Sequence, residues 1–174
     1  NTLGRTLNGR TLGIWGYGRI GQLVARYANA FGMHVMVWGS EASRFKAREH
    51  GFITAQSKEE LFMQSDVLSL HLRLSEQTRH IVNGHELGLM KPDALFVNTS
   101  RAELIAPNAL ENALNLGRPG AAALDVFDVE PVPPTHALLR LENVLATPHI
   151  GFVEQDSYER YFLPVFEAVH AFVH

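Results

Sequence analysis

The chain has 174 residues, of which 46% are hydrophobic and 19% charged, with a net charge of −3 and no cysteine. This length and composition favour one globular domain with its own core, which we expect to be cytoplasmic. The missing cysteines exclude disulfides and thiolate metal ligands, and we expect neither nucleic acid nor membrane partners because basic stripes and long apolar runs are absent.

Apolar runs of strand length alternate with helix-like segments along the chain. Strands are expected at 11–16, 34–39, 52–55, 66–72, 94–100, 121–127 and 143–149. Helices are expected at about 19–32, 41–50, 58–64, 84–90, 107–116 and 153–173. The strands are apolar throughout, which is typical of parallel strands covered on both faces. The pattern predicts an α/β fold of the Rossmann type, a doubly wound parallel sheet in three αβα layers, with residues 1–174 as one dinucleotide-binding domain.

The first predicted strand runs into a glycine-rich turn, GYGRIG, whose three glycines have the G-x-G-x-x-G spacing. Between a strand and an amphipathic helix, these glycines permit a tight turn, close approach to a diphosphate, and packing of helix on strand. The diphosphate would lie at the helix N-terminus. The alternative is a plain strand–turn–helix with incidental glycines. The loop residues expected at the cofactor are Gly16, Tyr17, Gly18, Arg19, Ile20 and Gly21.

Reactive side chains follow three of the predicted strands: Arg101, then Asp125 and Glu130, then His149. The carboxyl ends of parallel strands meet at one edge of the sheet, which is also the edge of the glycine turn. An arginine can hold a carboxylate, a histidine can exchange a proton with a carbonyl oxygen, and a neighbouring carboxylate favours the charged imidazole. A nicotinamide at this edge would supply the hydride. The alternatives are a surface or capping arginine, a turn histidine, a helix cap at Asp125 and a surface carboxylate at Glu130.

These motifs resemble the cofactor-binding domain of the D-isomer-specific 2-hydroxyacid dehydrogenases. The matching segments, within residues 3–152, are GIWGYGRIG, SLHLRLSEQTRHIV, FVNTSRAELI, ALDVFDVEP and ATPHIG. The resemblance implies that Arg101 binds the substrate carboxylate, His149 is the acid/base, Glu130 orients it and Asp125 holds the nicotinamide carboxamide. It implies further cofactor contacts from Leu72, Thr78, Thr99, Ser100 and Gly151.

Members of this family reduce 2-oxo acids with NAD(P)H and usually dimerise through this domain, so the resemblance implies a small-molecule 2-oxo acid substrate and a homodimer. They also carry a smaller substrate domain built from both chain ends, and almost none of it is present in this sequence. Both ends of the chain look cut. We expect the fragment to bind cofactor and to turn over little or no 2-oxo acid; measurable reduction by the 174 residues alone would contradict this.

The cofactor type depends on the turn after the second predicted strand. Gly39 stands where family members that use NAD usually have an aspartate for the adenosine ribose. Without that carboxylate, Ser40 and Arg44 could accommodate the 2′-phosphate of NADP. Glu41 could instead serve the ribose of NAD, or these residues could simply begin the next helix. We favour NADP over NAD.

Other interpretations remain open. A dinucleotide-sensing corepressor of the same fold is the alternative function, although the intact set of Arg101, Glu130 and His149 favours an enzyme. We expect no metal site, because the spacing of His170 and His174 has no acidic partner in register. The last predicted helix should kink or break at Pro164. Its aromatic residues predict packing on this domain, a second subunit or the missing domain; they are Tyr158, Tyr161, Phe162, Phe166 and Phe172.

Overall fold

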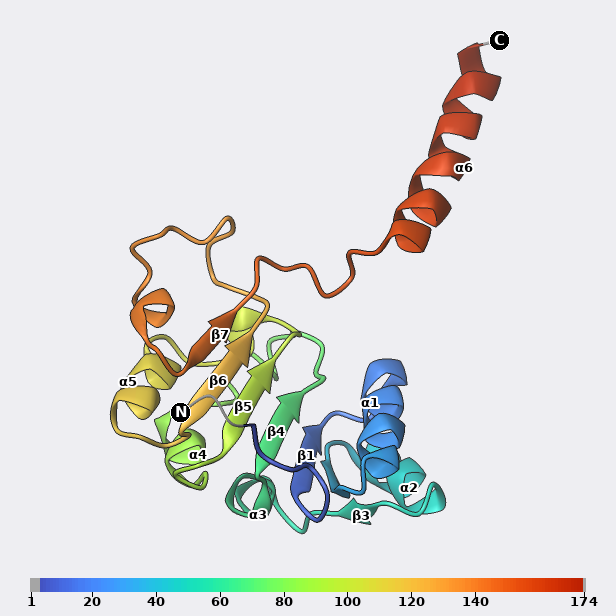
Figure 1. Ribbon diagram of the computed structural model, residues 1–174. Helices are drawn as coiled ribbons and strands as arrows, with labels where there is room; N and C mark the ends of the chain where they lie inside the picture. Colours follow the sequence, from blue (N-terminus) through green and yellow to red (C-terminus); the bar gives the residue numbers. More distant parts are fainter. Residues whose placement is uncertain (1–3, 174) are drawn as a thin grey trace.

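Seven parallel strands form one sheet, with helices on both of its faces (Figure 1). The computed structural model describes residues 4–173. The strand order is β3-β2-β1-β4-β5-β6-β7, and the order reverses between β1 and β4, the type of switch point at which α/β sheets bind ligands. The strands are β1 Thr11–Trp15, β2 His34–Trp38, β3 Ile53–Thr54, β4 Val67–Leu70, β5 Leu95–Asn98, β6 Ala121–Leu124 and β7 Val144–Ala146.

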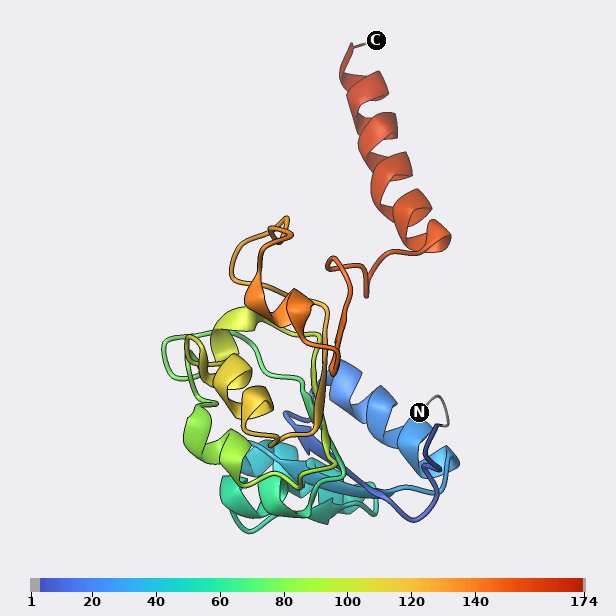
Figure 2. The same ribbon diagram turned by 60° about the vertical axis from the view of Figure 1, so that its left-hand side comes forward.

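Five helices divide between the two faces, which confirms the three layers and the Rossmann-type fold that the sequence predicts (Figure 2). One face is covered by α1 (Arg19–Ala30) and α2 (Glu41–Glu49). The other is covered by α3 (Lys58–Gln64), α4 (Gly84–Gly88) and α5 (Ala109–Asn115). Two short 3-10 helices lie in the loops after β5 and β6; they are η1 (Ala102–Leu104) and η2 (Ala137–Arg140).

Each face of the sheet has its own apolar core, because alternate strand side chains point to opposite faces. In β1, Ile14 is fully buried beneath α1 and α2. The next side chain, Trp15, points to the other face and meets Phe62 of α3 edge to face, with 5.8 Å between ring centroids. Burial of one such large side chain contributes about 1.5–3 kcal/mol, so the two cores together fix the edge of the sheet where the loops converge.

Several strands end earlier than the sequence predicts, and side-chain hydrogen bonds explain one case. The strand expected at 94–100 ends at Asn98. The Asn98 side chain accepts from the Ser100 N–H at 3.0 Å and donates to the Arg101 carbonyl oxygen at 2.8 Å. Such local bonds compete with the strand ladder. They turn the chain out of the sheet and place Arg101 in a loop at its carboxyl edge.

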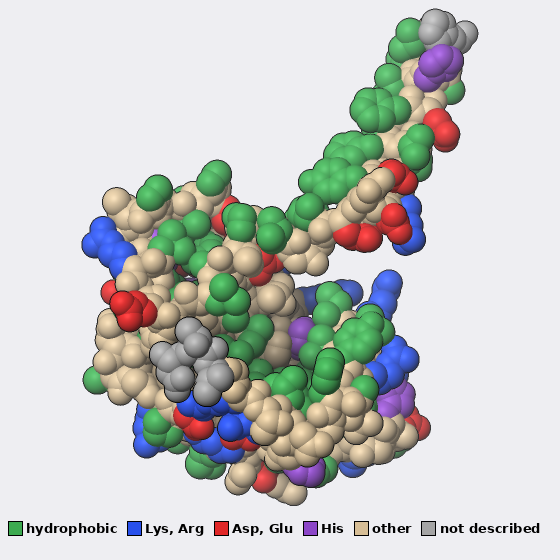
Figure 3. Space-filling model, viewed as in Figure 1, with side chains coloured by type: hydrophobic (Ala, Val, Ile, Leu, Met, Phe, Trp, Pro, Cys, Tyr) green, Lys and Arg blue, Asp and Glu red, His purple; other side chains and the backbone are tan. Residues whose placement is uncertain are grey.

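The last helix, α6 (Gln155–Val173), extends away from the sheet (Figures 1 and 2). It continues through Pro164, so of the kink or break predicted at this proline the break does not occur. None of its described residues is buried, so the option that it packs on this domain is also wrong. Its apolar side chains gather along the helix in Figure 3. Within residues 4–173, no helix combines the length and the apolar character that crossing a membrane requires.

Candidate functional site

The glycine turn between β1 and α1 forms one wall of the candidate site. Gly16 has a φ of +100°, and a Cβ there would lie 2.5 Å from the carbonyl oxygen of His71. A Cβ on Gly21 would clash with the carbonyl oxygen of Gly16. By contrast, a Cβ on Gly18 would meet nothing within 4 Å. The first and third glycines therefore allow close backbone packing, and the second borders open space in front of the helix N-terminus.

The side chain of Tyr17 points away from this open space, although the residue was expected at the cofactor. It is 3% exposed, packs against Phe52, and its hydroxyl lies 3.0 Å from Nδ1 of His50. Burial raises the pKa of this phenol, with a smaller opposing effect from Arg26. Only the backbone of Tyr17 is therefore available to a ligand in the turn.

Three hollows that share lining residues lie along the carboxyl edge of the sheet, and together they are called the groove. The first is lined by Trp15, Gly16, Tyr17, Gly18, Trp38, Gly39, Ser40, Ser43, His71, Leu72, Arg73, Gln77, Thr78 and Ile81. The second is lined by Gly18, Arg19, Ile20, Gly21, His71, Leu72, Arg73, Leu74, Thr99, Ser100 and Arg101. The third is lined by Arg101, Ala102, Glu103, Val126, Phe127, Asp128, Glu130 and His149. Since neighbouring hollows share residues, an extended ligand could reach from the turn after β2 to His149.

The turn after β2 brings only part of the expected set to the groove. Ser40 caps α2 by accepting from the N–H of Ser43 at 3.2 Å, as the helix-cap alternative foresaw. Glu41 lies on the outer side of α2 and lines none of the three hollows. The guanidinium carbon of Arg44 lies 4.5 Å from the ring centroid of Trp38, which itself lines the first hollow. The Nε atom of Arg44 is buried and has no hydrogen-bond partner within residues 4–173.

The loop after β4 contains two groove residues that the sequence analysis did not select, His71 and Arg73. His71 Nε2 lies 3.0 Å from the Ser69 hydroxyl, and burial lowers the pKa of His71 from 6.5 to about 4, so the ring is neutral near pH 7. The expected residue Thr78 donates its hydroxyl to the Arg73 carbonyl oxygen at 2.6 Å and accepts from the Ser75 N–H at 2.8 Å. The signal that could have found both missed residues is their place directly after a strand.

The third hollow brings together the three residues expected to be catalytic. Nδ1 of His149 lies 2.8 Å from Glu130 Oε2, and Arg101 lines the same hollow. The other carboxylate oxygen of Glu130 accepts from the Phe127 N–H at 3.0 Å. This N–H and the contact with His149 lower the pKa of Glu130, so the carboxylate stays charged. A charged carboxylate on Nδ1 leaves Nε2 of His149 as the atom that can exchange a proton with a substrate.

Asp125 lies behind this pair and has both carboxylate oxygens engaged. Oδ1 accepts from the Thr147 hydroxyl at 2.5 Å and from the Ile150 N–H at 2.9 Å, and Oδ2 accepts from the Gly151 N–H at 2.8 Å. Burial raises the pKa of Asp125, but these three hydrogen bonds outweigh it and the pKa is lowered. The bonds flank His149, whose φ of +56° is unusual for a residue with a side chain. Asp125 caps no helix, contrary to the helix-cap alternative; it anchors the turn that carries His149.

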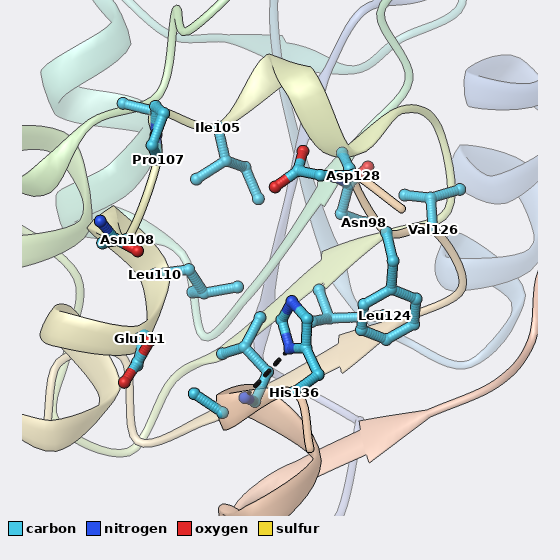
Figure 4. A pocket seen from close by; sticks show the side chains of 15 residues that line it. Asn98, Ile105, Pro107, Asn108, Leu110, Glu111, Leu124, Val126, Asp128 and His136 are labelled. Atoms are coloured by element: carbon cyan, nitrogen blue, oxygen red, sulfur yellow. Dashed lines mark hydrogen bonds between the residues drawn. The ribbon is translucent and has the colours of Figure 1, made fainter. Parts of the chain in front are cut away.

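A further hollow, of about 260 Å³, adjoins the third one between α5 and the loop after β6 (Figure 4). Asp128 and His136 point into it, and the His136 ring accepts from the N–H of Leu138 at 3.3 Å. Phe127 lines both hollows, and its ring centroid lies 5.5 Å from that of His136. The residue whose N–H holds Glu130 therefore forms part of the wall between the two hollows.

Within residues 4–173, no group of three or more His, Cys, Asp or Glu residues is arranged to hold a metal ion. Of the two histidines with zinc-like spacing, His170 lies on α6, whereas His174 is outside the described residues.

The comparisons with known proteins agree on one protein family. Residues 1–151 match the family model described as "D-isomer specific 2-hydroxyacid dehydrogenase, NAD binding domain". The chain is 41% identical to a glyoxylate reductase of Aeropyrum pernix over 98% of this chain and 50% of the relative. It is 39% identical to a hydroxypyruvate reductase of Thermotoga maritima over 95% of this chain and 54% of the relative. The chain therefore spans about half the length of the curated relatives that it matches.

Solved structures agree with this match. A phosphoglycerate oxidoreductase of Vibrio cholerae superposes with a TM-score of 0.93 and 55% identity over 99% of this chain and 55% of the other. An acyclic imino acid reductase, solved in complex with NADPH and D-Arg, superposes with a TM-score of 0.80 and 32% identity over 98% of this chain and 51% of the other.

Proposed function

Because the chain belongs to the NAD-binding domain family of the D-isomer specific 2-hydroxyacid dehydrogenases, we propose that it is the cofactor-binding and acid/base half of an enzyme that interconverts 2-oxo acids and D-2-hydroxy acids. The observation that carries this proposal is the Glu130–His149 pair, 2.8 Å apart, beside Arg101 at the end of the groove. The names of the relatives support reduction of glyoxylate or hydroxypyruvate. They give no support to the corepressor alternative, since those reported are enzymes.

The groove fits a dinucleotide because the second glycine borders open space at a helix N-terminus, where free N–H groups attract phosphate. The bound nicotinamide would supply the hydride for the carbonyl carbon. Arg101 would hold the substrate carboxylate through two hydrogen bonds. His149 would give the proton on Nε2 to the carbonyl oxygen, while Glu130 accepts from Nδ1 and stabilises the charged ring that this step requires.

The substrate itself would be selected by the half of the protein that this chain lacks. We propose that residues 1–174 form one dinucleotide-binding unit and that α6 packs on the missing half. Its exposed aromatic residues support this, since Tyr158, Phe162 and Phe166 stack along the helix with centroid distances of 5.5 and 6.4 Å. Apolar surface of this kind on an isolated helix indicates a partner surface. The fragment would accordingly bind cofactor and turn over little substrate alone.

A second exposed apolar stripe supports a homodimer through this domain. Leu23, Tyr27 and Phe31 follow one another at four-residue intervals on α1 and at its end, and are 40%, 63% and 64% exposed. Residues four apart share one side of a helix, so these side chains form a continuous surface outside the groove. A second copy of the chain would bury this stripe, separately from the surface of α6.

For the cofactor we favour NADP over NAD, and Arg44 is the reason. Its guanidinium carbon lies 4.5 Å from the ring centroid of Trp38, and Trp38 lines the first hollow together with Gly39, where no carboxylate would repel a 2′-phosphate. No hydrogen bond or ion pair engages this guanidinium within residues 4–173, so it could turn toward a phosphate without losing one. The imino acid reductase with a similar fold was solved with NADPH, which agrees with this preference.

The test uses the full-length protein. Fluorescence titration should show binding of NADPH and NADH, and either cofactor should be oxidised when glyoxylate or hydroxypyruvate is added. Arg44→Ala should weaken NADPH binding about tenfold or more and leave NADH binding nearly unchanged, because a phosphate contact is lost. Arg48→Ala is the matched control, since Arg48 lies on the same helix and donates to Thr54 outside the groove.

Two results would contradict the proposal. If neither dinucleotide binds, the chain is not a cofactor domain. If both bind but none of several 2-oxo acids is reduced, the catalytic assignment of His149 fails. Equal effects of Arg44→Ala on NADPH and NADH would contradict only the preference for NADP.

A further inference from the structure

The second hollow of the groove has an unusual charge distribution. Arg19, Arg73 and Arg101 all line it, and none of the described residues in its lining is acidic. The third hollow differs, because Glu103, Asp128 and Glu130 line it together with Arg101. A ligand segment in the second hollow therefore lies among three arginine residues and near the N-terminus of a 12-residue helix, α1. This environment favours a ligand with more than one negative charge.

The position of Arg73 is fixed by the chain on both sides of it. The preceding residues lie directly against the glycine turn: a Cβ on Gly16 would lie 2.5 Å from the carbonyl oxygen of His71 and 3.2 Å from Cδ2 of Leu72. The following turn is tied back by the Thr78 hydroxyl, which donates to the Arg73 carbonyl oxygen at 2.6 Å. The backbone that carries Arg73 is thus held beside the glycine turn, opposite α1.

Arg73 is also the charged residue at the junction of the first and second hollows. Four residues line both of them: Gly18, His71, Leu72 and Arg73. Two of these are apolar or lack a side chain, and the His71 ring is neutral near pH 7 because its pKa is about 4. The guanidinium of Arg73 makes no hydrogen bond or ion pair within residues 4–173, whereas that of Arg101 donates to the Ser100 carbonyl oxygen at 2.6 Å. Arg73 is therefore available to a ligand.

We propose that Arg73 binds the diphosphate of the dinucleotide from the β4 side of the groove, opposite the glycine turn. This inference rests on the proposed function. The junction of the two hollows lies in front of Gly18, where a diphosphate that uses the helix N-terminus would be located. The planar guanidinium can bind two phosphate oxygens at once, so it adds a side-chain cation to the backbone N–H groups of the turn.

The experiment compares Arg73→Gln with Arg79→Gln in the full-length protein. Both residues are exposed and belong to the same loop, but Arg79 lines neither hollow, so the two variants lose the same charge at different places. Dissociation constants are measured for NADPH, NADH and ADP-ribose by titration, and for adenosine by NMR. Circular dichroism checks that the variants are folded.

Arg73→Gln should weaken binding of the three diphosphate ligands about tenfold and leave adenosine unchanged, because the lost interaction is with phosphate. Its affinity for ADP-ribose should also depend less on salt than that of the unaltered protein. Arg73→Lys should recover part of the affinity, and Arg79→Gln should bind as the unaltered protein does.

Unchanged ADP-ribose affinity in Arg73→Gln would overturn the inference while leaving the proposed function intact. An equal loss of adenosine binding would also overturn it, because the effect would then be on the fold of the groove. Failure of the unaltered protein to bind any dinucleotide would overturn the proposed function itself.

Discussion

At the scale of single residues, Asp125 holds the turn that carries His149, the proposed acid/base. Its two oxygens accept three hydrogen bonds from Thr147, Ile150 and Gly151, which flank His149. The family resemblance assigns this carboxylate to the nicotinamide carboxamide. Since both oxygens already have donors, a carboxamide would share one of them, and the same aspartate would then link the cofactor to the turn that carries the acid/base.

Thr147→Val tests this link without altering the carboxylate. The substitution keeps the shape of the side chain but removes the hydroxyl that donates to Asp125 at 2.5 Å. A hydrogen bond to a charged group contributes about 1.5–3 kcal/mol, so the turn should loosen and kcat should fall about tenfold. The dissociation constant for NADPH should change little. Stopped-flow measurement of kcat and a fluorescence titration separate the two effects.

Thr54→Val, in the edge strand β3, is the control for a threonine hydroxyl far from the site. An unchanged kcat in Thr147→Val would show that the turn is held without this hydroxyl. A parallel loss of NADPH binding would show that the substitution acts on the cofactor rather than on His149.

Sequence reasoning was successful where chemistry and strand position coincide. Arg101, Glu130 and His149 follow different strands, and the sheet brings them to one hollow as expected from parallel topology. It could not tell that the side chain of Tyr17 turns into the core, because the glycine motif describes the backbone alone. Arg73 was missed because a place directly after a strand marks many residues, and only the fold shows that this one borders the first two hollows.

At the scale of elements, the two later glycines of the turn serve different purposes. A Cβ on Gly21 would clash with a carbonyl oxygen where α1 crosses β1, whereas one on Gly18 would point into open space. Gly21→Ala should therefore lower the free energy of unfolding by about 1–3 kcal/mol, the usual cost of overpacking. Gly18→Ala should cost no more than about 1 kcal/mol, since alanine is only a poorer helix cap.

The effects on dinucleotide binding should have the opposite order, with the larger loss of affinity in Gly18→Ala. The methyl group of Gly18→Ala would occupy space needed by the diphosphate, so binding should weaken about tenfold or more. Denaturant unfolding and NADPH titration on both variants check the prediction. A strongly destabilised Gly18→Ala, or one with unchanged affinity, would contradict it.

The order of the strands and helices could be predicted from the sequence more accurately than their boundaries. All seven expected strands are present in the expected order, but those expected at 66–72, 94–100, 121–127 and 143–149 end two or three residues early. Apolar or β-branched residues such as Leu72, Thr99 and Val126 lie beyond these ends, so hydrophobic pattern alone extends the strand. The strand before Ser100 is ended by local hydrogen bonds of the Asn98 side chain, and the strand before Asp125 is followed by tertiary hydrogen bonds from distant residues such as Ile150. Hydrophobic pattern alone reveals neither kind of bond.

At the scale of the whole molecule, two apolar surfaces lie apart, on α1 and on α6, and the chain spans about half the length of its curated relatives. Light scattering on the full-length protein should give the mass of a dimer. Replacing both Tyr27 and Phe31 by glutamate should give a monomer, because charges would be buried without partners. The matched double variant on α6, at Phe162 and Phe166, should leave the dimer intact but disturb contact with the missing half.

A dimer that survives the α1 substitutions would contradict the assignment of this stripe. Dissociation caused by the α6 variant would reverse the roles of the two surfaces. The sequence placed the aromatic residues of α6 on a helix, but it could not decide what covers them, because a hydrophobic pattern marks a surface that favours burial without identifying the partner surface.

The path of the chain between His149 and α6 has a mechanical consequence. Five residues separate the histidine from the helix, and the 19 residues of α6 form a lever about 28 Å long. A domain attached to the far end of α6 would exert a force on the turn at the base of the helix. The hydrogen bonds from the Ile150 and Gly151 N–H groups to Asp125 would resist that force and keep the His149 imidazole beside Glu130.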